Sequence, residues 1–145
     1  MENQKKSWTL TTGWIVLFIL GLIIALGGLE SLYIAYGTAD NPVAGVSLAR
    51  LADVHPDIPL MLRARRATAA SLAFSLGVLL AWIAFVPFRH AEKWAWRAIG
   101  ISFAFGCLLA LLRIPLLGTQ SGIGQAIFAL VIVIMALAIS YRDFK

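Results

Sequence analysis

Glu30 is the residue whose type and position could do chemistry most directly, because it interrupts an apolar stretch at residues 13–36. A charge inside a membrane is costly unless a partner compensates it, so intramembrane acids often mark functional sites. We expect Arg113, at similar depth in a later apolar segment, to form an ion pair with Glu30. Alternatively, both side chains extend separately to the membrane surface, or the pair only sets helix register.

An unpaired Glu30 would suit general acid or base catalysis, with Tyr33 or Arg113 stabilising charge. These three residues are the catalytic candidates. Further polar side chains fall near the same end of the apolar segments, and some share a helix face through three- and four-residue spacing. Singly, such hydroxyls more often bond to neighbouring helices. Together they predict a small polar cavity that opens outward and binds a ligand through Glu30, Ser31, Thr68, Ser71, Ser75, Arg113, Gln120 and Gln125.

Arg63, Arg65 and Arg66 precede the second apolar segment. Arginines in this position usually anchor a helix at the membrane surface. The alternative is that one of them joins Glu30 or binds a lipid phosphate through bidentate hydrogen bonds.

Asp53, His55 and Asp57 carry atoms suited to general base catalysis or a weak metal site, but their spacing is unspecific and such loop side chains are usually solvated. Cys107 is the only cysteine, so neither an intramolecular disulfide nor a thiolate metal cluster can form. The sequence lacks a nucleophile elbow, a phosphate-binding loop and a di-metal carboxylate set. We expect no metal and no cofactor.

Four apolar segments must position these residues. Hydrophobic residues make up 61% of the chain and charged residues 13%, whereas about a quarter of a soluble domain is charged. Each crossing needs about 20 apolar residues, and the runs lack the alternation of barrel strands. The sequence predicts an all-α, single-domain, four-transmembrane-helix bundle, with an outer loop at residues 37–66 and helices at residues 13–36, 67–88, 94–117 and 125–141.

Local signals refine this prediction. Pro115 removes a backbone donor and should bend or end the third helix, and residues 43–52 are expected to form a short interfacial helix. Small residues at four-residue spacing allow close helix approach, more often within the bundle than in a dimer. These pairs are Gly21 with Ala25, Gly100 with Ala104, and Gly106 with Ala110.

The net charge of +5 is concentrated in short clusters at the ends of the apolar segments, which is typical of membrane anchors and not of nucleic-acid binding. The first apolar stretch is too long for a signal peptide, so we expect a retained helix. We predict an integral cell-membrane protein with both termini in the cytoplasm, because one side carries Lys5, Lys6, Arg89, Lys93, Arg97, Arg142 and Lys145.

Over residues 13–141 the layout resembles the DoxX-like group of small four-helix membrane proteins. The resemblance rests on an arginine-bearing approach to the second helix (residues 59–66), a charged, tryptophan-containing hairpin (residues 89–96), and an arginine followed by glycine (residues 113–118). The chain is more distantly similar to the emopamil-binding and sigma-2-like group, whose members bind sterols or cationic amphiphiles in an acidic intramembrane pocket. It departs from that group because only Glu30 offers an acid within a helix.

Two functions are consistent with these observations. The first is binding of a membrane lipid or small lipophile in the outer-leaflet cavity, or service as an accessory subunit with a membrane protein partner or a second copy. The alternative is an intramembrane isomerase or cyclase that acts on an apolar substrate with Glu30 as acid or base. Transport is disfavoured, because four helices without inverted repeats provide little apparatus for alternating access. A Glu30 held by Arg113 would indicate an architectural role.

Overall fold

Helices make up most of the computed structural model, which describes residues 7–37, 42, 45–118 and 123–144. These residues contain no β-strand. The predicted all-α fold is confirmed, and the chain is an integral membrane protein with four stretches long and apolar enough to cross a membrane. These stretches are Trp8–Tyr36, Ile58–His90, Lys93–Leu116 and Ile123–Phe144.

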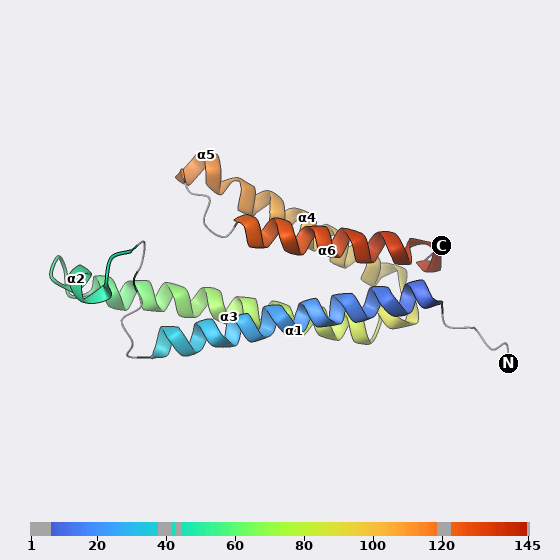
Figure 1. Cartoon of the computed structure of the whole chain (residues 1–145), viewed down its shortest axis with the longest axis horizontal. Coiled ribbons are helices and arrows are strands. Elements are labelled where there is room, and N and C mark those ends of the chain that lie inside the picture. Colours follow the sequence, from blue (N-terminus) through green and yellow to red (C-terminus); the bar gives the residue numbers. More distant parts are fainter. Residues whose placement is uncertain (1–6, 38–41, 43–44, 119–122, 145) are drawn as a thin grey trace. The chain divides into compact units, whose positions relative to one another are not determined.

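Figure 1 shows the order of the helices along the chain. Four elements are short: α2, α5, and the 3-10 turns η1 and η2 that follow α3 and α6. The elements are α1 (Trp8–Tyr36), α2 (Leu48–Ala52), α3 (Ile58–Phe85), η1 (Phe88–His90), α4 (Lys93–Leu111), α5 (Arg113–Leu117), α6 (Ile123–Ser140) and η2 (Tyr141–Phe144).

Helix α3 begins at Ile58, well before the predicted start at residue 67. Pro59 is compatible with this start, because the first turn of a helix leaves its backbone N–H groups without intrahelical partners. The leucines, alanines and arginines that follow are all strong helix formers. The segment predicted as the end of a loop therefore extends the helix, and its arginines lie on α3.

The third crossing is interrupted at Leu112, which separates α4 from α5. Pro115 explains the interruption, because its ring clashes with the carbonyl of the residue four positions earlier and its nitrogen carries no proton. The second piece ends at Gly118, whose positive φ of 63° suits a residue without a side chain, and whose N–H donates to the carbonyl of Ile114 at 3.0 Å. The predicted break near Pro115 is confirmed.

The chain forms two compact units, and their boundaries fall within α1 and α3. The hairpin unit is Gly21–Val78, and the terminal unit comprises Met1–Leu20 and Leu79–Lys145.

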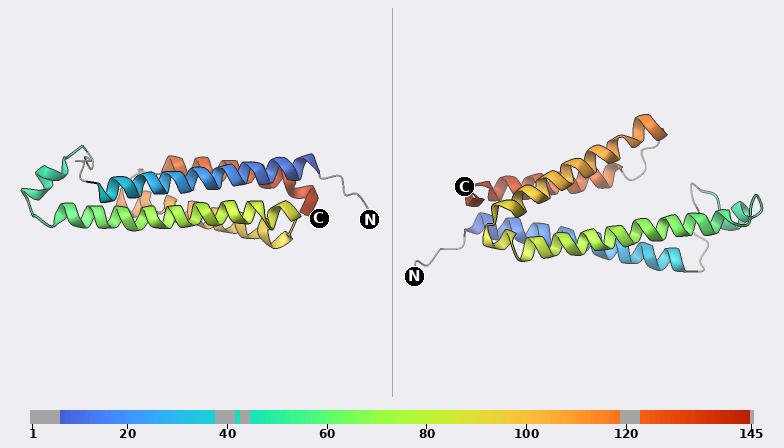
Figure 2. Two further views of the ribbon diagram at one scale, coloured as in Figure 1. Left: turned by 90° about the horizontal axis from the view of Figure 1, so that it is seen from below. Right: turned by 180° about the vertical axis from the view of Figure 1, so that it is seen from behind.

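In the hairpin unit, α1 and α3 lie side by side in every view (Figures 1 and 2). A Cβ atom added to Gly77 would lie 2.3 Å from the backbone nitrogen of Ala25 and 2.7 Å from the carbonyl oxygen of Gly21. One added to Gly28 would lie 2.5 Å from the nitrogen of Phe74. The two backbones are therefore in direct contact, which confirms the packing role predicted for Gly21 and Ala25.

In the terminal unit, α4 packs against α6. The indole Nε1–H of Trp96 donates to the carbonyl of Leu137 at 3.0 Å. Ser140 is fully buried and donates to the carbonyl of Ala136 at 2.7 Å. A Cβ atom added to Gly13 would lie 3.1 Å from that of Ser140, so α1 approaches α6 closely here.

An aromatic cluster strengthens the same unit. The Arg89 guanidinium carbon lies 5.5 Å from the ring centre of Trp14 and 5.4 Å from that of Phe85, within the range of a cation–π interaction. Phe88 is fully buried, with its ring centre 4.8 Å from that of Phe144. These contacts join the start of α1, the link between α3 and α4, and the end of the chain.

Candidate functional site

The acidic centre of the candidate site is Glu30, six residues before the end of α1. Its side chain is exposed. Among the described residues of the hairpin unit, none forms an ion pair or a hydrogen bond with its carboxylate. Arg113 belongs to the terminal unit, so the ion pair with Glu30 and the separate extension of the two side chains both stay open as predictions.

The basic centre of the site is Arg66, on α3. Its Nε–H donates to the hydroxyl oxygen of Ser31 at 3.3 Å, across the α1–α3 pair. Arg63 is half-buried and Arg65 is exposed on the same part of α3. An acid and a base thus occupy one end of the hairpin unit, because Glu30 directly precedes the serine that Arg66 contacts.

The uncharged stretches of α1 and α3 explain why Glu30 and Arg66 lie at the same level along the helix pair. Neither residues 7–29 nor residues 67–88 contain a charged side chain, and the parts of these stretches that lie in α1 (residues 8–29) and α3 (residues 67–85) are about 33 and 28 Å long. The hydrocarbon core of a membrane is about 30 Å thick. The similar lengths favour a position for Glu30 and Arg66 at the edge of the hydrocarbon, and the Ser31 hydrogen bond is formed where both stretches end.

The three hydroxyl groups of α3 that were predicted to line a cavity bond within their own helix. Thr68 donates to the carbonyl of Ala64 at 3.1 Å, Ser71 to that of Ala67 at 2.9 Å, and Ser75 to that of Ser71 at 2.9 Å. Their protons are engaged by their own helix, as is common for such residues in membrane helices. They can still offer oxygen lone pairs to a ligand.

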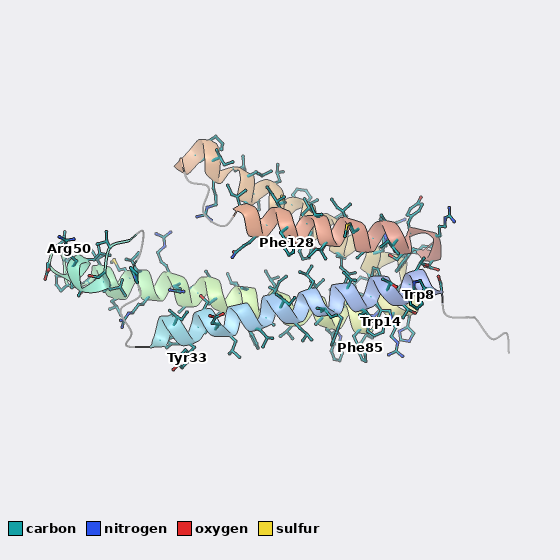
Figure 3. All side chains as sticks on the ribbon, in the orientation of Figure 1. Trp8, Trp14, Tyr33, Arg50, Phe85 and Phe128 are labelled. Carbon is teal, nitrogen blue, oxygen red and sulfur yellow. The ribbon has the colours of Figure 1, made fainter. Side chains whose placement is uncertain are left out.

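The remaining predicted residues belong to both units. Tyr33 is 81% exposed and projects from α1 in Figure 3; it lies one turn after Glu30 and shares its face. Arg113 is the exposed first residue of α5, and Gln125 is exposed near the start of α6. Gln120 lies outside the described residues.

The position of Arg113 favours extension to the membrane surface. Arg97 and Arg113 delimit an uncharged part of the third crossing that is only about 22 Å long. Because this distance is shorter than the hydrocarbon core, at least one of these side chains must extend along the helix to reach water.

The segment between α2 and α3 is exposed throughout its charged residues. The His55 Nδ1 atom lies 3.8 Å from a carboxylate oxygen of Asp57 and accepts a hydrogen bond from its backbone N–H at 3.3 Å. This local contact is consistent with a solvated turn.

Sequence reasoning missed the hydrogen bond between Arg66 and Ser31, although it had singled out both residues. The similar length of the two uncharged stretches was the signal that could have predicted it. No family model, curated protein or solved structure matches the chain. The likeness to the DoxX-like group therefore depends on the short motifs of the sequence.

Proposed function

We propose that the chain binds a membrane lipid or small lipophile at the Glu30 end of the hairpin unit. The observation that carries this proposal is the exposed Glu30 carboxylate, which has no ion pair among the described residues of its unit and adjoins the Ser31–Arg66 contact. An acid and a base that belong to adjacent helices and form no ion pair with each other remain available to a polar ligand group.

An apolar path leads away from these charges. Leu22 and Leu26 are exposed and precede Glu30 at four-residue intervals, so the three side chains form one stripe along α1. A polar group held at Glu30 would leave an attached hydrocarbon chain against these leucines. This arrangement supports an amphiphilic ligand over a small polar one.

The proposal includes an orientation. The clusters of lysine and arginine favour a cytoplasmic location for both termini, which places Glu30 in the outer leaflet. Membership of the DoxX-like group is a further proposal, supported by the arginines of α3 and by the charged residues between α3 and α4.

The alternative function is catalytic. Glu30 and Tyr33 lie one turn apart on one face of α1, which would suit an acid or base with a hydroxyl beside it. An isomerase or cyclase would act there on an apolar substrate.

An accessory role in a membrane complex would instead use the exposed apolar faces of the helices.

Native mass spectrometry of the chain in membrane patches tests the proposal. We expect one stoichiometric lipid or lipophile to accompany the protein, and to be lost from a variant with Glu30→Gln and Arg66→Gln. A matched control carries Glu92→Gln and Arg97→Gln, which change exposed charges in the terminal unit, and should retain it. A protein companion without a bound lipophile would support the accessory role instead.

A further inference from the structure

We infer that the ligand is a phosphatidylethanolamine, with its phosphate held by Arg66 and its primary ammonium held by Glu30. This inference depends on the function proposed above and specifies the headgroup. Its basis is that Arg66, an exposed base, bonds to Ser31 on the adjacent helix, and that the preceding residue, Glu30, is an exposed acid where both uncharged stretches end.

Arg66 is oriented to receive a phosphate. Its Nε–H is engaged by Ser31 at 3.3 Å, which holds the guanidinium against α1 and leaves the terminal nitrogens to donate. A planar guanidinium matches two phosphate oxygens at once. No carboxylate among the described residues of the hairpin unit forms an ion pair with Arg66, and Arg63 and Arg65 add positive charge nearby.

Glu30 supplies the group that distinguishes one headgroup from another. Its carboxylate accepts hydrogen bonds, and a primary ammonium has three N–H groups to donate. The quaternary ammonium of phosphatidylcholine has none, and the glycerol of phosphatidylglycerol carries no positive charge. The acid therefore favours ethanolamine over both.

Glu30 and Arg66 lie on adjacent helices without an ion pair between them, as a headgroup that bridges them requires. Glu30 is adjacent in sequence to Ser31, yet it forms no ion pair with Arg66. In phosphatidylethanolamine an ethylene unit separates the phosphate from the ammonium, so one headgroup can contact two side chains that do not contact each other. The acyl chains would then lie along Leu22 and Leu26, which are exposed on the face of Glu30.

Lipid titration of the purified full-length chain tests the inference. Phosphatidylethanolamine, phosphatidylcholine and phosphatidylglycerol with identical acyl chains would be added in detergent and bound lipid counted by native mass spectrometry. We expect phosphatidylethanolamine to bind about tenfold more tightly than the others, as one additional charge-assisted hydrogen bond predicts.

Two variants test the roles given to Glu30 and Arg66 in binding the headgroup. Glu30→Gln should abolish the preference for phosphatidylethanolamine without weakening phosphatidylglycerol binding, whereas Arg66→Gln should weaken all three lipids. The Glu92→Gln and Arg97→Gln controls should bind as the unmodified chain does.

The unmodified chain alone can overturn the inference, so the test does not depend on a variant that folds. Equal binding of the three lipids, or a preference for phosphatidylglycerol or phosphatidylcholine, would overturn the headgroup assignment and leave lipid binding intact. Failure to bind any of the three would overturn the assignment. If no lipophile accompanied the chain in native membrane patches either, the proposed function would fail as well.

Discussion

The carboxylate of Glu30 carries one negative charge, for which Arg113 and a lipid ammonium would compete. A permanent ion pair with Arg113 would neutralise it and set helix register, whereas a lipid ammonium would use the same oxygens. The exposure of Glu30 and the short uncharged interval before Arg113 favour the lipid, because Arg113 can reach the membrane surface without Glu30. Neutralisation of each residue, singly and together, separates the two possibilities.

We predict that Glu30→Gln and Arg113→Gln change the unfolding free energy additively, within about 0.5 kcal/mol, as expected for independent sites. Thermal and denaturant unfolding in detergent would measure this. The cycle of Glu30→Gln with Arg97→Gln serves as the control. An ion pair would give the opposite result: Glu30→Gln alone would destabilise the protein more than the double change, and the carboxylate would be assigned to Arg113.

At the scale of elements, the contact between α1 and α3 depends on backbone proximity. Helices in lipid gain little from the hydrophobic effect when they associate, so packing of small residues contributes much of their affinity. Gly28 and Gly77 provide this contact, because no Cβ atom fits at either position without displacing a backbone. The neighbouring Gly27 has no such atoms within 4 Å of an added Cβ.

We predict that Gly28→Ala and Gly77→Ala each destabilise the protein by about 2 kcal/mol, the usual effect of excess volume in a packed interface. Gly27→Ala is the matched control and should be neutral or slightly stabilising, since alanine favours helix over glycine. Thermal unfolding in the same detergent compares the three. Similar midpoints for Gly27→Ala and Gly28→Ala would show that the contact does not limit stability.

At the scale of the whole molecule, the distribution of positive charge determines which leaflet contains Glu30. The link between α3 and α4 and the segment between α2 and α3 lie at opposite ends of the second crossing. Because cytoplasmic loops are enriched in lysine and arginine, the first of these is expected inside and the second outside.

We predict that a membrane-impermeant maleimide labels an Asp57→Cys variant in intact cells, and labels a Glu92→Cys variant only after permeabilisation. Both positions are exposed. Each variant also carries Cys107→Ala, which removes the only native cysteine, and the Cys107→Ala chain alone serves as the unlabelled control. The reverse pattern would place the termini outside and Glu30 in the cytoplasmic leaflet.

The candidate site was only partly predictable from the sequence. Glu30 stands out because a charge within an apolar stretch needs a partner, and Tyr33 follows from helical spacing. Arg66 was recognised as an arginine near a helix start, but its bond to Ser31 requires α3 to begin at Ile58. Hydropathy missed that start because arginines form helix well while they lower the apolar average.

The sequence by itself determined that the chain is a helical membrane protein with four crossings and a break near Pro115, because apolar length and proline chemistry act locally. Only the tertiary structure decided that Gly28 and Gly77 bring α1 and α3 into backbone contact, and that Arg66 meets Ser31. The alignment of two helices depends on which side chains are small enough to pack across the pair, and hydropathy along either helix does not contain this information.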